Sequence, residues 1–103
     1  MSELFSKEYM KASAKFKEAS KDASEAYKKY KEVLANGPFD KKTSELLLLS
    51  ASCAIQCSYC IETHAKKAKA LGATEQEIAH VIHLAAQIKH GATLSYGIIG
   101  LQE

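Results

Sequence analysis

The sequence contains no arginine: all 14 of its basic residues are lysines, and the formal net charge is only +2 at pH 7. Proteins that bind nucleic acids rely on arginine, because its planar guanidinium donates two hydrogen bonds at once to a phosphate or a base edge. A small net charge also provides little attraction to a polyanion. We therefore expect no nucleic-acid partner.

Long apolar runs are also missing. The longest is the leucine stretch 46–49, whereas a membrane-spanning helix needs about 20 apolar residues. Residues 1–10 include charged side chains and no long apolar run, so they do not resemble a signal peptide. The odd count of 3 cysteines does not suit the fully paired disulfide framework of a secreted protein. We expect a cytoplasmic protein with no membrane partner, whose cysteines serve redox or metal chemistry.

What remains is an ordinary globular composition, with 47% hydrophobic and 25% charged residues in a chain of 103. This length suits a single domain over residues 1–103. A chain this short buries only about two-thirds of the surface that it exposes when unfolded. We therefore expect long helices in it to need partner subunits to cover them.

Apolar side chains in residues 1–36 recur at alternating spacings of four and three, which is the 3.5-residue period of an amphipathic helix. They are Phe5, Tyr9, Ala12, Phe16, Ala19, Ala23, Ala26, Tyr30 and Val33. We predict one long helix that ends at Asn36-Gly37-Pro38, because asparagine or glycine suits a helix end and proline cannot continue the helix. Its apolar stripe packs either on its own domain or against a neighbouring subunit, and the sequence does not distinguish the two.

Three further helices follow. The first begins near 40–44, reaches 54 and is apolar nearly all round, so we expect it to be buried. The second covers 58–71, and Thr74 with Glu77 has the spacing of a capping box that opens the third. No strand pattern is present. The predicted fold class is therefore all-α, with a long N-terminal helix followed by an antiparallel helical bundle over 38–97.

Two thiols and a histidine stand close together near the middle of the chain. Cys57 and Cys60 are three positions apart, and His64 follows four positions after the second cysteine. On a helix such neighbours share a face. A helix start favours the reactive thiolate, two thiols at this spacing can form a disulfide, and an imidazole one turn away can move a proton near neutral pH. The pattern favours a dithiol–disulfide site.

Two other interpretations of these residues stay open. The cysteines can be small buried side chains and His64 a core residue, or Cys53 can join them as a fourth zinc ligand. In a continuous helix Cys53 and His64 are about 16 Å apart, whereas zinc ligands lie within about 2.3 Å of the ion. Four-ligand zinc therefore requires a helix break near Gln56. We expect no metal and no cofactor, and Cys53 is expected to be a core residue rather than a third redox thiol.

Glu45 stands at the start of the apolar helix and is followed immediately by four leucines. A carboxylate in this position can simply interact with the positive end of the helix dipole. If it turns inward with the leucines, it becomes a buried base suited to proton transfer. Helical periodicity alone does not distinguish these two roles.

Together these residues resemble the carboxymuconolactone decarboxylase superfamily, specifically its alkylhydroperoxidase D-like branch. The matching elements are Glu45, Cys57 twelve positions later, the Tyr59-Cys60 pair and His64, and the resemblance covers residues 38–97. It implies an all-helical subunit that assembles into a homo-oligomer, either a trimer or a hexamer, with sites near subunit contacts.

The resemblance also implies an oxidoreductase that reduces a small peroxide or a disulfide with Cys57 and Cys60 and is served by a thiol redox partner protein. Glu45 and His64 complete the implied catalytic set and relay protons through water. Peroxidase members of the branch tend to carry histidine directly before the second cysteine, where this chain has Tyr59. This difference favours disulfide exchange over antioxidant peroxidase activity.

Two other functions are also compatible with these residues. One is an enzyme of the superfamily that acts on a small organic substrate with His64 and Glu45 as acid and base. The other is a non-catalytic helical assembly or metal-binding protein. Within the redox interpretation, the helix start favours Cys57 as the attacking thiol on a disulfide, and the nearness of His64 favours Cys60 on a peroxide.

Overall fold

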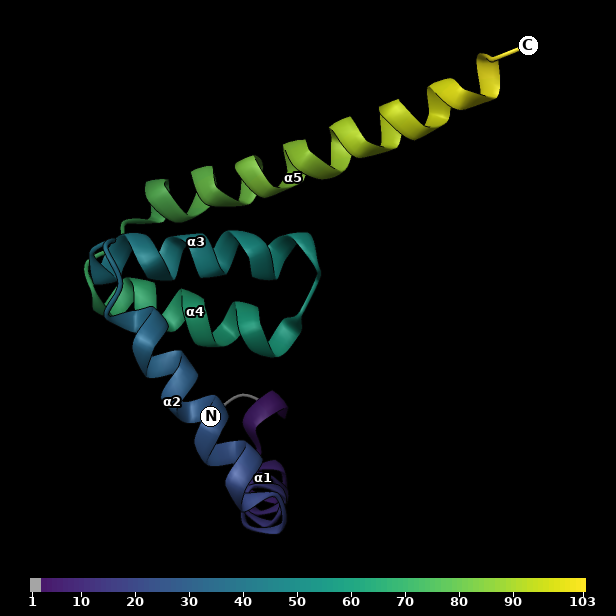
Figure 1. The fold of residues 1–103 in the computed structure, drawn as a ribbon. Helices are drawn as coiled ribbons and strands as arrows, with labels where there is room; N and C mark the ends of the chain where they lie inside the picture. The colour runs from purple at the N-terminus through teal and green to yellow at the C-terminus, as the bar shows by residue number, and fades with distance from the viewer. Residues whose placement is uncertain (1–2) are drawn as a thin grey trace. The chain divides into compact units, whose positions relative to one another are not determined.

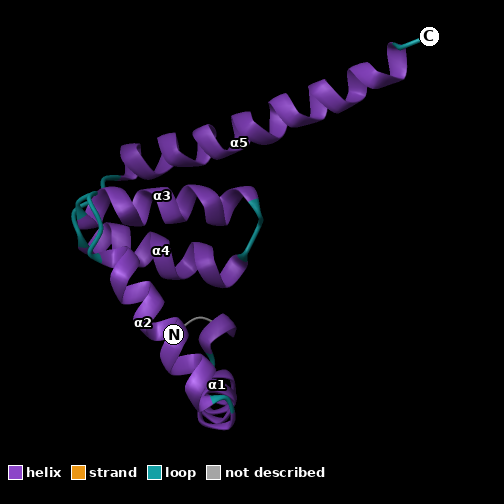
Figure 2. Cartoon of the chain, in the orientation of Figure 1, coloured by secondary structure: helices purple, strands orange, loops and turns teal. Residues whose placement is uncertain are grey.

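The computed structural model describes residues 3–103, and every regular element within that range is a helix (Figure 1, Figure 2). The predicted all-α fold class is confirmed. Residues 1 and 2, which open the predicted N-terminal helix and the segment compared with a signal peptide, lie outside the described residues. The chain divides into two compact units, one ending at Phe39 and one beginning at Asp40. The single-domain organisation stays a prediction.

The N-terminal unit consists of a short 3-10 helix, η1 (Glu3–Phe5), and two α-helices, α1 (Lys7–Ala19) and α2 (Lys21–Ala35). Two helices thus stand where one was predicted, because the backbone leaves helical geometry at Ser20. The Ser20 hydroxyl donates to the carbonyl of Phe16 at 2.6 Å. Such side-chain bonds compete with the helical hydrogen bonds of the backbone. The break leaves the apolar spacing intact, so periodicity does not reveal it.

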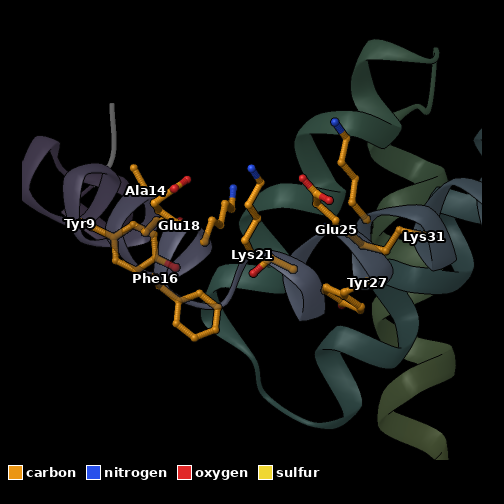
Figure 3. A pocket seen from close by; sticks show the side chains of 12 residues that line it. Tyr9, Ala14, Phe16, Glu18, Lys21, Glu25, Tyr27 and Lys31 are labelled. Carbon is orange, nitrogen blue, oxygen red and sulfur yellow. The ribbon is translucent and has the colours of Figure 1, made fainter.

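Neither α1 nor α2 buries any residue in the described structure. Their large apolar side chains stay exposed, including Phe16 at 68% and Tyr27 at 61%. Residues of both helices line an open hollow of about 770 Å³, which Figure 3 shows with tyrosine and lysine side chains along it. Its lining contains neither cysteine nor histidine. This unit therefore offers apolar surface rather than redox chemistry. The two predicted alternatives for its apolar stripe, packing on its own domain or against a neighbouring subunit, are both retained.

The second unit contains α3 (Lys41–Ala54), α4 (Ser58–Ala70), α5 (Glu75–Ile98) and a closing 3-10 helix, η2 (Ile99–Leu101). α3 contacts both α4 and α5. Figure 1 shows α4 antiparallel on one side of α3 and α5 along the other, with the C-terminal part of α5 extending beyond the end of α3. α3 is therefore the central helix of this unit.

Side-chain caps define where these helices begin. Asp40 caps α3 by accepting a hydrogen bond from the backbone N–H of Thr43 at 2.8 Å, and this bond lowers the pKa of the Asp40 carboxyl. The predicted capping box of Thr74 and Glu77 is confirmed at the start of α5. Glu77 also pairs with Lys42 at 2.8 Å, and this partner lowers the pKa of the Glu77 carboxyl. The pair ties the start of α5 to the start of α3.

The core of the second unit is small. Its buried residues come from α3, α4 and α5: Leu49, Ser52, Ala68, Val81 and Ala85. The leucine-rich helix, expected to be buried because it is apolar nearly all round, buries Leu49 but not Leu47 and Leu48, which are 52% and 45% exposed, so the expectation is wrong for these two leucines. Within the second unit α4 and α5 pack against α3, and Leu47 and Leu48 lie outside these two contacts.

Candidate functional site

The candidate site is built around the turn between α3 and α4. Gln56 N–H donates to the carbonyl of Cys53 at 3.1 Å, and Cys57 N–H donates to that of Ser52 at the same distance. This pair of bonds is the Schellman motif, which requires a left-handed residue just after the helix. Gln56 provides that conformation with a φ of 57°. The turn thereby delivers Cys57 directly to the start of α4.

Cys57 is the N-cap of α4. Its Sγ accepts a hydrogen bond from the backbone N–H of Cys60 at 3.2 Å, in the place that a serine or aspartate oxygen usually takes. The two cysteines form a disulfide, and their Cα atoms are 5.3 Å apart. Both residues are half-buried. The two-residue spacer thus brings the sulfurs together at a helix start rather than inside a helix.

This position favours a negative charge on sulfur when the disulfide is reduced. Unpaired N–H groups and the positive end of the helix dipole meet at the N-terminus of α4, which is 13 residues long. The Sγ of Cys57 already accepts one of these N–H groups, and the same contact stabilises a thiolate. Cys57 is therefore the sulfur that the helix start serves, whereas Cys60 lies inside the first turn.

A carboxylate and an imidazole from neighbouring helices meet further along α4. Glu45 Oε2 on α3 lies 2.6 Å from Nδ1 of His64 on α4. Their side chains are 17% and 21% exposed, so the contact is largely shielded from water. Of the two arrangements considered for Glu45, this is the inward one. The contact between the two groups is direct, and the relay of protons through water from this pair to a thiol stays a prediction.

The contact with Glu45 determines what the His64 ring can do. When Nδ1 donates its proton to the carboxylate, the ring is held in one orientation and Nε2 is the basic nitrogen. Cys60 and His64 are four residues apart on α4, so they share a face of that helix. The contact with Glu45 therefore fixes an imidazole on the face of α4 that also carries Cys60.

Cys53 is a free thiol on the last turn of α3 and is half-buried. It lines a second hollow, of about 340 Å³, together with Gln56, Ile82 and Lys89. Sequence reasoning did not select Gln56 or Lys89. A signal for Gln56 was available, because a helix that ends before Cys57 without a glycine leaves a non-glycine residue to form the turn, and helix ends often use the left-handed region. Lys89 has no such signal, since only the packing of α5 on α3 brings it to this hollow.

Two kinds of feature are absent from residues 3–103. No group of three or more His, Cys, Asp or Glu side chains is arranged to hold a metal ion. The helix break that four-ligand zinc requires does occur at Gln56, but Cys57 and Cys60 are bonded to each other. In the same part of the chain, no helix is both long enough and apolar enough to cross a membrane.

Known proteins with similar sequences give these residues a context. The model of the carboxymuconolactone decarboxylase family matches residues 21–99. The chain is 38% identical over 66 residues to Uncharacterized protein 4 in cox locus of Paracoccus denitrificans. The aligned residues make up 64% of this chain and 60% of that protein. It is 36% identical over 63 residues to alkyl hydroperoxide reductase AhpD of Coxiella burnetii, and these residues make up 61% of this chain and 36% of that protein. The chain thus spans less than two-thirds of the length of these relatives.

A crystal structure of a protein from Methanobacterium thermoautotrophicum has the same fold. Its TM-score is 0.80 at 26% identity, and the match covers 84% of this chain and 99% of that one. The family match includes Glu45, both cysteines of the disulfide and His64, and it extends over more than half of the chain. The chain therefore belongs to the carboxymuconolactone decarboxylase family, in its alkylhydroperoxidase D-like branch.

Proposed function

We propose that the protein is a thiol–disulfide oxidoreductase whose reacting groups are Cys57 and Cys60, assisted by Glu45 and His64. The observation that carries this proposal is the Cys57–Cys60 disulfide at the start of α4, on the helix whose histidine directly contacts a carboxylate. A helix start promotes exchange because it stabilises the thiolate, which is the attacking and the leaving species. The histidine–carboxylate pair supplies the proton transfers that accompany exchange.

The reaction begins with the reduced protein. The Cys57 thiolate attacks one sulfur of a substrate disulfide, so that a protein–substrate disulfide forms and the other substrate sulfur leaves as a thiolate. The Cys60 thiolate then attacks the Cys57 sulfur. The Cys57–Cys60 bond forms, and the second half of the substrate leaves. The substrate gains two electrons and two protons, and the protein loses both until a dithiol partner protein reverses the exchange.

Glu45 and His64 act as the proton relay in this scheme. His64 accepts the Cys60 proton at Nε2 before the second attack and returns it to the departing thiolate. Glu45, bonded to Nδ1, stabilises the ring while it carries the extra proton. The relay acts on Cys60, because the hydrogen bond from a backbone N–H at the helix start goes to the Cys57 sulfur and not to the Cys60 sulfur.

Peroxide reduction is the second candidate, and the position of His64 one turn after Cys60 favours it. In this reaction the Cys60 thiolate attacks a peroxide oxygen, the O–O bond breaks, and a sulfenic acid and an alcohol form, with the proton supplied by His64. Cys57 then displaces water from the Cys60 sulfur, and the disulfide forms. Tyr59 stands where peroxidase members tend to carry histidine, so we place disulfide exchange first.

We further propose that the protein works as a homo-oligomer, either a trimer or a hexamer. Large apolar side chains remain exposed on α3 and α5, including Leu94, Tyr96 and Ile98 near the C-terminal end of α5. That part of α5 extends beyond α3 (Figure 1). Apolar patches of this kind mark surfaces that another chain covers. Light scattering at micromolar concentration is expected to give at least a trimer, and a monomer would contradict this proposal.

Single serine variants of the three cysteines test the redox proposal. Reduced protein is mixed with 2-hydroxyethyl disulfide, and its remaining thiols are counted. Wild type and Cys53→Ser are expected to lose two thiols per chain, whereas Cys57→Ser and Cys60→Ser are expected not to form the internal disulfide. Serine at position 57 is itself a good N-cap, so its effect is chemical rather than structural. Full disulfide reduction by both Cys57→Ser and Cys60→Ser would end the proposal.

A further inference from the structure

Gln56 adopts a backbone conformation that glycine usually occupies. Its φ is 57°, and it is the one non-glycine residue with a positive φ in the described part of the chain. A side chain in this region costs free energy, because the Cβ atom approaches the following carbonyl oxygen. Outliers of this kind persist mostly at functional sites. Gln56 directly precedes Cys57, so this unusual conformation lies next to the proposed attacking sulfur.

The end of α4 has the same turn, but with a glycine. Gly72 has a φ of 93°, and its N–H donates to the carbonyl of Lys69 at 3.0 Å, while Ala73 N–H donates to that of Ala68 at 2.9 Å. A Cβ at Gly72 would meet nothing within 4 Å, so glycine is present there for its backbone alone. The chain thus uses glycine where only the turn is required and glutamine where the turn precedes Cys57.

Local hydrogen bonding does not explain this glutamine. Asparagine and aspartate tolerate the left-handed conformation because their short side chains bond to the nearby backbone. The side chain of Gln56 is longer and exposed, and it makes no hydrogen bond to any of residues 3–103. Its amide therefore offers both a donor and an acceptor to a molecule outside the chain.

The hollow beside Gln56 suggests what that molecule contains. It has a volume of about 340 Å³ and lies between the last turn of α3 and α5. Besides Gln56 it is lined by Cys53, Ala54, Ile82, Ala85, Ala86 and Lys89. The lining is therefore mostly small and apolar, with a single cationic group. A short peptide segment that carries a carboxylate complements this lining, because Lys89 attracts the carboxylate and the alanines leave room for the segment.

We propose that Gln56 is a specificity-determining residue that hydrogen-bonds a peptide group of the substrate, so that the substrate class is a peptidyl disulfide with a nearby carboxylate. A primary amide has one donor face and one acceptor, which match the C=O and N–H of a peptide bond. This inference rests on the proposed disulfide exchange and adds which chemical groups the substrate carries beside its disulfide, namely a peptide group and a carboxylate.

The recognition acts at the first exchange step. When the Cys57 thiolate attacks the peptidyl disulfide, a Cys57–substrate S–S bond forms, the substrate S–S bond breaks, and the other half leaves as a thiolate that takes a proton. The half that is bonded to Cys57 lies beside Gln56, and its peptide group and carboxylate meet the Gln56 amide and Lys89. A disulfide without amide or carboxylate groups undergoes the same chemistry without these contacts.

Two small disulfides and two variants test this inference in the full-length protein. Glutathione disulfide has peptide groups and carboxylates, whereas 2-hydroxyethyl disulfide has neither. Gln56→Gly keeps the turn and removes the side chain. It is expected to lower kcat/KM for glutathione disulfide by about three- to tenfold, as for the loss of one hydrogen bond, and to leave the value for 2-hydroxyethyl disulfide within about twofold. Lys89→Gln is expected to lower the glutathione value by about two- to threefold, with a loss that shrinks at high salt.

The outcomes separate this inference from the proposed function. Selective losses for glutathione disulfide, with an unchanged or higher Tm for Gln56→Gly, support the role of the side chain. Equal changes for both disulfides would overturn the inference and leave the oxidoreductase proposal standing. If the wild-type protein reduces neither disulfide, the proposed function fails and the inference fails with it.

Discussion

Replacing Glu45 with glutamine tests the proton relay most directly, because it removes one charge and changes almost no volume. The carboxylate lies 2.6 Å from Nδ1 of His64 in a contact that is largely shielded from water. A hydrogen bond to a charged group contributes about 1.5–3 kcal/mol to stability, and a neutral one about 1 kcal/mol. The expected loss in the free energy of unfolding is therefore about 1–2 kcal/mol, which corresponds to a fall in Tm of about 5–10 °C.

The effect of Glu45→Gln on the reaction is expected to depend on pH. Without the carboxylate the His64 ring loses the contact that holds its orientation, so it removes the proton of Cys60 less often. General acid–base catalysis contributes about 10²–10⁴-fold. Because Glu45 acts through the imidazole, we expect the rate of internal disulfide formation at pH 7 to fall by about tenfold. Above about pH 9 a thiol ionises without assistance, and the two proteins should react at similar rates. Rapid quenching with an alkylating reagent measures these rates.

Glu77→Gln is the matched control for this experiment. Glu77 also has a close partner, Lys42 at 2.8 Å, and glutamine retains the capping box at the start of α5. This variant should react at the wild-type rate at every pH. If Glu45→Gln also reacts at the wild-type rate at pH 7 while its Tm falls as expected, Glu45 only joins two helices and the relay is refuted.

Three further predictions follow from the same structure. Leu49 is 1% exposed, so Leu49→Ala should cost about 2–5 kcal/mol and lower the Tm measured by circular dichroism, whereas Leu47→Ala, at a position 52% exposed, should lower it much less. Because Lys42 and the α5 N-terminus lower the pKa of Glu77, the stability from this carboxylate is present above its ordinary pKa of 4.5 and is lost as the pH falls through the lowered value. The Tm difference between wild type and Glu77→Gln should therefore disappear in acid, and a constant difference would contradict the assignment. Alkylating the reduced thiols should abolish disulfide reduction, and activity on a small organic substrate that survives alkylation would favour the acid–base alternative.

Helix boundaries of the second unit were predictable because their signals are local. Asp40, the Thr74 capping box and Gly72 each act through one side chain or one backbone conformation that the residue type reveals. The break at Ser20 was not predictable in this way. Serine occurs within helices and at their ends, and the apolar period continues across the break without a shift.

The residues of the candidate site were predictable to different degrees, because some of their contacts are local in sequence and others depend on helix packing. Cys57 and Cys60 are close in sequence, and a turn of helix is enough to bring them together. The contact between Glu45 and His64 joins residues 19 positions apart and depends on how α3 packs on α4, so periodicity left it open and only the family resemblance pointed to it. The exposure of Leu47 was not predicted, because an apolar pattern shows that a side chain favours burial but not whether its own chain or another subunit buries it.

α3 also makes the site sensitive to the length of the chain. Glu45 lies near the first turn of this helix, and the last turn leads through Gln56 to Cys57. Each residue added to an α-helix turns everything beyond it by about 100° and moves it by about 1.5 Å. One inserted residue would therefore separate either Glu45 from His64 or Cys57 from its place at the start of α4. The number of residues between Glu45 and Cys57 therefore fixes the relative positions of the two parts of the site. This stretch is expected to accept many substitutions but neither an insertion nor a deletion.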